Sequence, residues 1–254
     1  MMTNDLSKEQ QLQEEEYTYP YHYIPSYKDS AFSQVQYWSW GFRYLGGMQV
    51  VLDQLKKEVF ESLLDVGCGD GRFLREVTNH YPDIKSLGVD YSEQAIRLAK
   101  AMNPSLHYRA TNILDERLFE QFDVVTLVEV LEHIPPAQVP DFIQAAATLV
   151  KPNGKVILTV PHSNQRVQEK HYQHFTSQKL KELLAPHFRE LEFLPFDPVS
   201  KVFSLLVRIF GGSGKNYVIT NSQLLSWFYQ VYINHYLYTN DENKCLRIAV
   251  VCRK

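Results

Sequence analysis

The alternation of apolar and helical segments after Glu61 constrains the fold of this chain more than any other feature. Short apolar runs, each suited to one buried strand, alternate there with longer segments of helical periodicity. The expected strands cover residues 62–66, 86–89, 106–109, 123–128 and 155–160, and the expected helices cover 72–80, 92–102 and 137–150. Strands and helices that alternate in this way form a parallel sheet with both faces covered. The pattern therefore predicts a doubly wound α/β fold.

The remaining segments extend this fold at both ends. A further helix is expected at 177–184, a strand at 190–194 and a final strand at 245–252. The connection 198–242 is too long for an ordinary loop, and its apolar and aromatic runs predict a helical insert before the last strand. We expect a flexible tail (1–16), an aromatic and helical N-terminal cap (17–60), and one α/β domain (61–254) that contains the insert.

Composition restricts the partners of such a domain. With 254 residues, 44% of them hydrophobic, the chain can bury one substantial core. A formal net charge of −3 without a basic cluster disfavours nucleic acid, because phosphate binding needs concentrated positive charge. Three cysteines without metal-type spacing and a polar N-terminus favour a cytoplasmic location. No apolar run reaches the roughly 20 residues that span a bilayer, so membrane contact is expected only at the surface.

A glycine loop follows the first expected strand and precedes a helix. Gly67, Gly69 and Gly71 allow the bare backbone to approach a ligand closely, as in loops that seat a dinucleotide pyrophosphate. The carboxylates of Asp65 and Asp70 would repel a pyrophosphate. They would attract the ammonium and sulfonium groups of S-adenosylmethionine, by about 4 kcal/mol for a close pair at intermediate dielectric before desolvation. Charge therefore favours S-adenosylmethionine as the cofactor.

Two later positions are expected to complete a nucleoside site. Asp90 ends the second strand, nineteen residues beyond the glycine loop, where a carboxylate can accept both hydroxyls of a ribose; Tyr91 follows it. Helix capping is the alternative role for Asp90, but Ser92 already supplies that cap. After the third strand, Asn112 either forms a turn or pairs with the adenine edge while Ile113 packs on the ring.

In combination these motifs resemble those of the class I S-adenosylmethionine-dependent methyltransferases. The loop 65–71 resembles the first motif of that family, and the later motifs follow in the family's order at Asp90, Asn112, 122–125 and 149–154. The similarity covers about residues 62–161. It implies a Rossmann-like sheet of seven strands with an antiparallel last strand, and S-adenosylmethionine bound across the carboxyl ends of the first strands. In that family the aspartate matching Asp90 holds the ribose, and the first-motif loop holds the methionine half.

An aromatic helix upstream of the domain offers a further cofactor contact. Trp38, Trp40 and Arg43 resemble a helix that many members of the family place over the methionine carboxylate. A guanidinium can bind a carboxylate through two parallel hydrogen bonds. Arg43 is therefore a candidate for that contact. The alternative is an amphipathic helix with one arginine at the surface.

The segment after the fourth strand carries candidate catalytic residues. Glu129, Glu132 and His133 are close enough in sequence to share one wall of a cleft, and a neutral histidine is a suitable base near physiological pH. The same Glu-x-x-Glu-His pattern resembles ubiquinone-pathway O-methyltransferases and small-RNA 3′-terminal 2′-O-methyltransferases, where these residues can bind a divalent metal such as Mg²⁺. The alternative is that they contact the cofactor, Glu129 included, or shape the pocket without a metal.

Two histidines follow the fifth strand and face the same crevice. His171 and His174 can complete a metal site or provide the base; alternatively they pack and cap the helix that begins near Ser177. In the RNA enzymes an aromatic-acidic run follows the paired histidines, and here 175–178 departs from it. We therefore expect O-methylation of a small-molecule, lipid-like or glycan-linked acceptor. An RNA 2′-O-methyltransferase and a non-catalytic S-adenosylmethionine-binding scaffold are the alternatives.

The insert carries two apolar, aromatic helical segments, 201–210 and 224–238. A pair of such helices can cover an acceptor pocket, form the face of a homodimer, or lie in a membrane interface. Plain packing on the domain is the alternative. If the helices cap the pocket, their apolar lining would suit a lipid-like acceptor.

Overall fold

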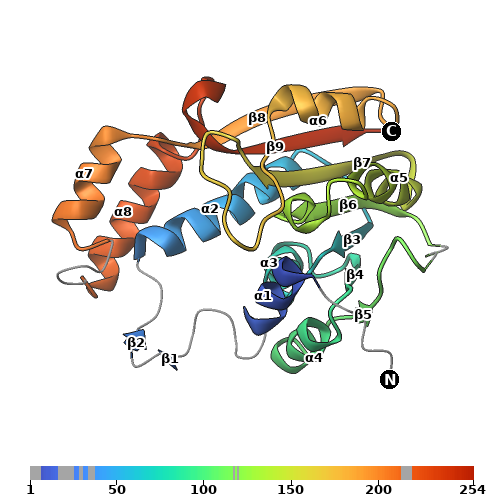
Figure 1. The fold of residues 1–254 in the computed structure, drawn as a ribbon, viewed down its shortest axis with the longest axis horizontal. Helices are drawn as coiled ribbons and strands as arrows, with labels where there is room; N and C mark the ends of the chain where they lie inside the picture. The colour runs from blue at the N-terminus through green and yellow to red at the C-terminus, as the bar shows by residue number, and fades with distance from the viewer. Residues whose placement is uncertain are drawn as a thin grey trace.

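A seven-stranded sheet forms the centre of the molecule (Figure 1). The computed structural model describes residues 7–16, 26–28, 31–33, 38–116, 118, 120–212 and 219–254. The strands of the sheet are β3 (Ser62–Val66), β4 (Lys85–Asp90), β5 (Tyr108–Ala110), β6 (Phe122–Val128), β7 (Val150–Pro161), β8 (Glu190–Pro198) and β9 (Cys245–Arg253). Their order is β5-β4-β3-β6-β7-β9-β8; β9 runs antiparallel to both of its neighbours, β7 and β8, and the other neighbouring pairs of this sheet are parallel. The predicted Rossmann-like sheet with an antiparallel last strand is thereby confirmed.

Helices cover both faces of the sheet. They are α2 (Trp38–Leu55), α3 (Arg72–His80) and α4 (Glu93–Met102), and on the other face α5 (Val139–Thr148) and α6 (Ser177–Leu184). Successive strand residues point to opposite faces, so Leu63 joins the core under α2, α3 and α4, whereas Leu64 joins the core under α5 and α6. Two cores on one sheet explain why the strand segments are apolar throughout rather than alternating.

The predicted helical insert before the last strand is α7 (Lys201–Ile209) and α8 (Ser222–His235). It forms a third core with the N-terminal part of α2, in which Trp38 stacks on Phe228 with ring centroids 5.8 Å apart. Tyr232, also on α8, lies in the same cluster. Figure 1 shows the pair at one end of the molecule, joined to the sheet through α2. Among the described residues, no helix is long and apolar enough to cross a bilayer.

The N-terminal segment differs from the predicted flexible tail, because helix α1 (Lys8–Glu16) lies within it. Ser7 begins this helix with reciprocal bonds: its hydroxyl accepts the Gln10 N–H at 3.2 Å, and the Gln10 side chain accepts the Ser7 N–H at 3.0 Å. Such a capping box offsets the absence of an apolar stripe. Two short antiparallel strands, β1 (Ser26–Lys28) and β2 (Ala31–Ser33), follow in the sequence. The aromatic run 17–23 of the predicted cap lies outside the described residues.

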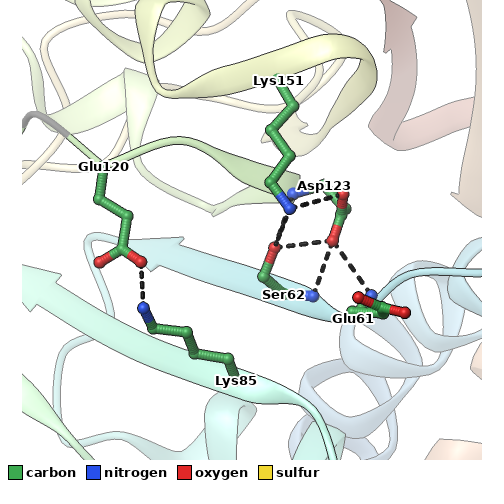
Figure 2. A network of polar contacts seen from close by, with 6 residues as sticks. All are labelled: Glu61, Ser62, Lys85, Glu120, Asp123 and Lys151. Carbon is green, nitrogen blue, oxygen red and sulfur yellow. Dashed lines mark hydrogen bonds and ion pairs between the residues drawn. The ribbon is translucent and has the colours of Figure 1, made fainter.

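Polar contacts tie the strands together at the amino edge of the sheet (Figure 2). The Asp123 carboxylate accepts the backbone N–H groups of Glu61 and Ser62 at 3.1 and 2.9 Å, and the Ser62 hydroxyl at 2.7 Å. Lys151 adds an ion pair with Asp123 at 3.0 Å. Burial opposes ionisation of Asp123, but the hydrogen bonds from Ser62 and Lys151 outweigh it and lower its pKa. This network therefore lies at the edge of the sheet opposite the carboxyl ends of the parallel strands, where a ligand site is expected.

Candidate active site

A cavity of about 950 Å³ opens at the carboxyl ends of β3, β4 and β6. It lies where the strand order reverses between β3 and β6, the usual ligand position in an open α/β sheet. The predicted cofactor residues that line it are Arg43, Asp65, Gly67, Gly69, Asp90, Tyr91, Asn112, Ile113 and Glu129. Glu132, His133 and His171 line it as well.

The glycine loop adopts a backbone that explains its sequence. Gly67, Gly69 and Gly71 all have positive φ, at 74°, 52° and 78°. Such φ values are strained for residues with a side chain. Gly71 does not line the cavity; a Cβ there would lie 2.4 Å from the Tyr108 hydroxyl. Its glycine is therefore required for packing and turn geometry rather than for direct contact with a ligand.

Asp90 is held rigidly at the end of β4. One carboxylate oxygen accepts the Gly69 N–H and the other accepts the Ser92 N–H, both at 2.9 Å. Ser92 separately caps α4 by accepting the Ala95 N–H at 3.1 Å, as predicted. Burial raises the pKa of Asp90 to about 6 despite these hydrogen bonds. Asp90 thus presents an oriented acceptor pair to the cavity.

Asp65 lies deeper, at the start of the glycine loop. It is buried, and its Oδ1 accepts the Thr126 hydroxyl at 2.8 Å. Burial, with a smaller contribution from the Asp90 charge, raises the pKa of Asp65 to about 7. Burial also raises the pKa of Asp70, whose carboxylate accepts the Arg72 N–H at 3.1 Å. A cation in the cavity would stabilise the ionised form of all three aspartates, whereas a pyrophosphate would destabilise it.

The side chain of Asn112 serves the local turn. Its Oδ1 accepts the Leu114 N–H at 3.1 Å, and its Nδ2 donates to Asp115 at 2.6 Å. These bonds favour the turn-forming role among the two predicted from the sequence. Ile113 is buried and lines the cavity next to it.

Arg43 reaches the cavity from α2 and belongs to a charged group that the sequence did not predict. Its Nε lies 3.5 Å from Oδ1 of Asp197, and the Nε of Arg247 lies 3.5 Å from the other oxygen of that carboxylate. Asp197 is buried and has a left-handed backbone with φ 55°. Arg247 packs over the Phe196 ring, 4.6 Å from its centroid. Arg247, which interrupts the apolar residues of strand β9 near its start, was the available signal.

Three side chains offer metal ligands to the same cavity. Glu132, His133 and His171 each place one ligand atom within 4.8 Å of the others. The sequence grouped Glu129 with the first two; the structure brings His171 into that group instead. Burial raises the pKa of Glu132 well above its usual range, and the Glu129 charge adds to the rise. Among the described residues, Glu129 Oε1 and Glu132 Oε2 are buried oxygens without a hydrogen-bond donor.

Hydrogen bonds orient the three histidines. The Nδ1 atoms of His133 and His174 lie 3.1 Å from the backbone oxygens of Lys170 and Gln165, so in the neutral rings each Nδ1 carries the proton. Nε2 of His174 then accepts from Nδ1 of His171 at 2.9 Å. This series of hydrogen bonds leaves Nε2 of His171 as its basic nitrogen, on the side of the ring away from His174.

Burial keeps His171 uncharged. Desolvation, followed by the neighbouring charge of His133, lowers the pKa of His171 to about 3. Burial also lowers the pKa of His174, which does not line the cavity and lies behind His171. His171 is therefore a neutral base candidate at the cavity wall, and His174 a residue that positions it.

Comparison with known proteins agrees with this geometry. Residues 37–191 match the family model of the methyltransferase domain. A ubiquinone biosynthesis O-methyltransferase from Ralstonia nicotianae is 37% identical over 111 residues, which cover 41% of this chain and 44% of that protein. The chain spans half the length or less of the curated relatives it matches.

Solved structures share the fold. An S-adenosylmethionine-dependent methyltransferase from Archaeoglobus fulgidus superimposes with a TM-score of 0.57 at 16% identity, covering 85% of this chain and 98% of that one. The N-methyltransferase NodS from Bradyrhizobium japonicum, solved with S-adenosyl-L-homocysteine, gives a TM-score of 0.56 at 15% identity, covering 84% and 87%. Since the family model spans more than half of its residues, this chain belongs to the methyltransferase domain family, as the resemblance of its motifs predicted.

Proposed function

We propose that the chain binds S-adenosylmethionine in this cavity and transfers its methyl group to a small-molecule acceptor. The observation that carries the proposal is Asp90, whose two carboxylate oxygens are fixed by backbone N–H groups at the end of β4 and face the cavity. In this arrangement the two ribose hydroxyls donate to Asp90, and the acidic loop around Gly67 and Gly69 receives the methionine half. Arg43 exchanges part of its ion pair with Asp197 for the methionine carboxylate.

A hydroxyl acceptor suits the other wall of the cavity. Methyl transfer is an in-line displacement, so the protein must align the acceptor oxygen and accept its proton. Nε2 of His171 is neutral and can accept a hydrogen bond from the acceptor hydroxyl. Because burial lowers the pKa of that ring to about 3, the proton moves to Nε2 only as the methyl group transfers and the oxygen becomes acidic, and the Nδ1–H bond to His174 stabilises the charged ring. The other candidates from the sequence, His133 and Glu129, line the same wall and complete the acceptor environment. The names of the curated relatives, O-methyltransferases of ubiquinone biosynthesis, support an oxygen acceptor.

A divalent cation fits the acceptor wall. Glu132, His133 and His171 would hold it as an alternative to proton transfer by His171, because the Nε2 lone pair that binds a metal cannot also accept a proton. The buried oxygen of Glu132 that has no hydrogen-bond donor among the described residues fits a metal ligand. When bound, such a cation lowers the pKa of a coordinated hydroxyl. Two imidazoles with one carboxylate suit Mn²⁺ or Zn²⁺ better than Mg²⁺, which prefers oxygen ligands. The proposed ion is therefore a transition metal, with Mg²⁺ as the weaker candidate.

The alternatives have weaker support. An RNA acceptor needs phosphate-binding charge, and the chain carries a net charge of −3. A non-catalytic scaffold would not need Glu132, His133 and His171 to converge on the cofactor cavity. Among the small-molecule, lipid-like and glycan-linked acceptors, a lipid-like one is supported by Trp40, Ile134 and Phe142, which line the cavity.

A labelled-methyl screen tests this function. The protein is incubated with methyl-labelled S-adenosylmethionine and a metabolite extract, and mass spectrometry identifies a product that gains one methyl group. His171→Ala should abolish the product while S-adenosylhomocysteine still binds. His174→Gln retains an acceptor for the His171 Nδ1–H and should keep more activity than His174→Ala. An extract product that forms equally with His171→Ala would contradict the proposed base.

The metal is tested separately by calorimetry. Mn²⁺ titrated into the wild type should bind with one site, and Glu132→Gln should abolish that binding. His174→Ala should weaken Mn²⁺ binding by roughly 10–100-fold, as expected for a residue that orients a ligand. Equal Mn²⁺ affinity in the wild type and Glu132→Gln would exclude the proposed ligands.

A further inference from the structure

Helix α7 presents an apolar face that no other described element covers. Val202, Leu205 and Ile209 are about half exposed, at 59%, 50% and 49%, and their spacing of three and four residues places them on one side of the helix. Phe203, on the opposite side, is buried against α8. Most strongly exposed large apolar side chains among the described residues lie in or beside the insert. They are Val199, Val202, Leu205, Ile209, Trp227 and Tyr238.

The charge of the insert is opposite to that of the whole chain. The insert (198–242) contains Lys201, Arg208 and Lys215 against Asp241 and Glu242 at its C-terminal end, a formal charge of +1, although the whole chain has a net charge of −3. Lys201 and Arg208 are exposed and lie seven residues apart, so they share one side of α7. That side is one residue, or about 100°, around the helix from the apolar stripe. An apolar stripe bordered by basic residues is typical of helices that lie in a membrane interface.

The exposed residues are not used by the cofactor cavity. None of the described residues between 198 and 242 lines that cavity, so the expectation that these helices cap the acceptor pocket does not hold for them. Helix α2 connects the two regions instead. Trp38 and Phe42 on one side of α2 pack against the insert, whereas Trp40 and Arg43 on its other side line the cavity (Figure 1).

We propose that α7 and the exposed side of α8 form a docking surface for an anionic lipid membrane. The apolar stripe inserts among the acyl chains, Lys201 and Arg208 pair with lipid phosphates, and the Trp227 indole, 59% exposed, lies at headgroup depth. A second copy of the chain is a poorer occupant, because a symmetric contact through this face would bring the same positive charges together. In this arrangement α2 lies between the membrane-bound insert and the cofactor cavity.

Vesicle flotation tests the proposal independently of methyl transfer. The full chain is mixed with vesicles of phosphatidylcholine alone or with added phosphatidylglycerol. We expect flotation with the anionic vesicles, reduced as salt rises from about 0.05 to about 0.5 M. Leu205→Glu/Ile209→Glu and Lys201→Gln/Arg208→Gln should each lower the partition coefficient by about tenfold or more. Val59→Glu is the matched control, because Val59 is fully exposed but lies outside the insert.

Two further measurements make the outcome decisive. S-adenosylhomocysteine affinity and thermal unfolding of each variant should equal those of the wild type, which shows that the variants fold. Absence of flotation of the wild type at low salt, or equal flotation of Leu205→Glu/Ile209→Glu, would overturn the proposal. A concentration-dependent dimer in sedimentation velocity that the same pair of substitutions dissociates would also overturn it, in favour of a second copy as the occupant.

Discussion

Replacing Asp90 by alanine tests the cofactor site without knowledge of the acceptor. Each carboxylate oxygen of Asp90 already accepts one backbone N–H, from Gly69 and Ser92, both at 2.9 Å. This anchoring leaves further lone-pair capacity on each oxygen for the two hydroxyls of a ribose. Hydrogen bonds to a charged group contribute roughly 1.5–3 kcal/mol each. Loss of two therefore weakens binding by about 3–6 kcal/mol, or about 10²–10⁴-fold in Kd.

The acidity of Asp90 supplies a second signature. Its pKa in the ligand-free protein is raised to about 6 by burial. Ribose hydroxyls donate to the ionised carboxylate, so binding favours loss of the proton. Affinity should therefore be constant at high pH and fall as the pH drops through about 6, by up to about tenfold per pH unit. Asp65, with a pKa of about 7, acts in the same direction, so the decline should be steeper in the wild type than in Asp90→Asn.

Calorimetry with S-adenosylhomocysteine between about pH 5 and about pH 8 measures both effects. Asp123→Asn is the control, because Asp123 lies at the opposite edge of the sheet (Figure 2) and its substitution should leave Kd within about twofold. If Asp90→Ala binds within about threefold of the wild type, or if wild-type affinity rises on acidification, the assignment of Asp90 is refuted.

Three further substitutions test the physical account of the loop and the sheet. Asp65→Asn should stabilise the ligand-free protein at about pH 8 by about 1–3 kcal/mol in urea unfolding. Because the folded-state pKa of about 7 lies above the ordinary 3.8, the stability that protonated Asp65 contributes is fully present below about pH 3.8 and is lost as the pH rises through about 7. A stability gain of Asp65→Asn that persists at about pH 4 would contradict this. Gly71→Ala should cost about 1–3 kcal/mol, because φ is 78° and the new Cβ meets Tyr108; adding Tyr108→Phe should restore only part of the loss. Asp123→Ala should cost about 1–3 kcal/mol through its lost bonds to Ser62, with cofactor affinity unchanged; a loss of affinity instead would show that the amino edge affects the site.

Local chemistry explains why the fold and the cofactor loop could be predicted. Leu63 and Leu64 are both buried, one under each layer of helices, so the strand appears in the sequence as an uninterrupted apolar run. Gly67 and Gly71 need their residue type because their φ is positive, a requirement that depends only on the local backbone. Even the helix at Lys8–Glu16, which was missed, had a local signal in the Ser7 to Gln10 capping box.

The acceptor wall could be predicted only in part. Glu132 and His133 are neighbours, so their common location follows from the sequence. His171 places a ligand atom beside theirs, whereas Glu129 is not part of that group although its charge acts on Glu132. The sequence placed both His171 and His174 at this crevice; the path of the loop after β7, which no local pattern encodes, decides that His171 rather than His174 reaches the wall.

The sequence by itself determined the order of strands and helices, the glycine loop and the position of Asp90, because periodicity, turn chemistry and strand ends depend on residues within a few positions of one another. The tertiary structure alone decided which distant side chains converge. It placed Arg247 and Arg43 on either side of Asp197, paired His171 with Glu132, and turned the apolar stripe of α7 away from the domain. Such contacts join segments far apart in the chain, so they depend on how loops and layers pack rather than on any local pattern.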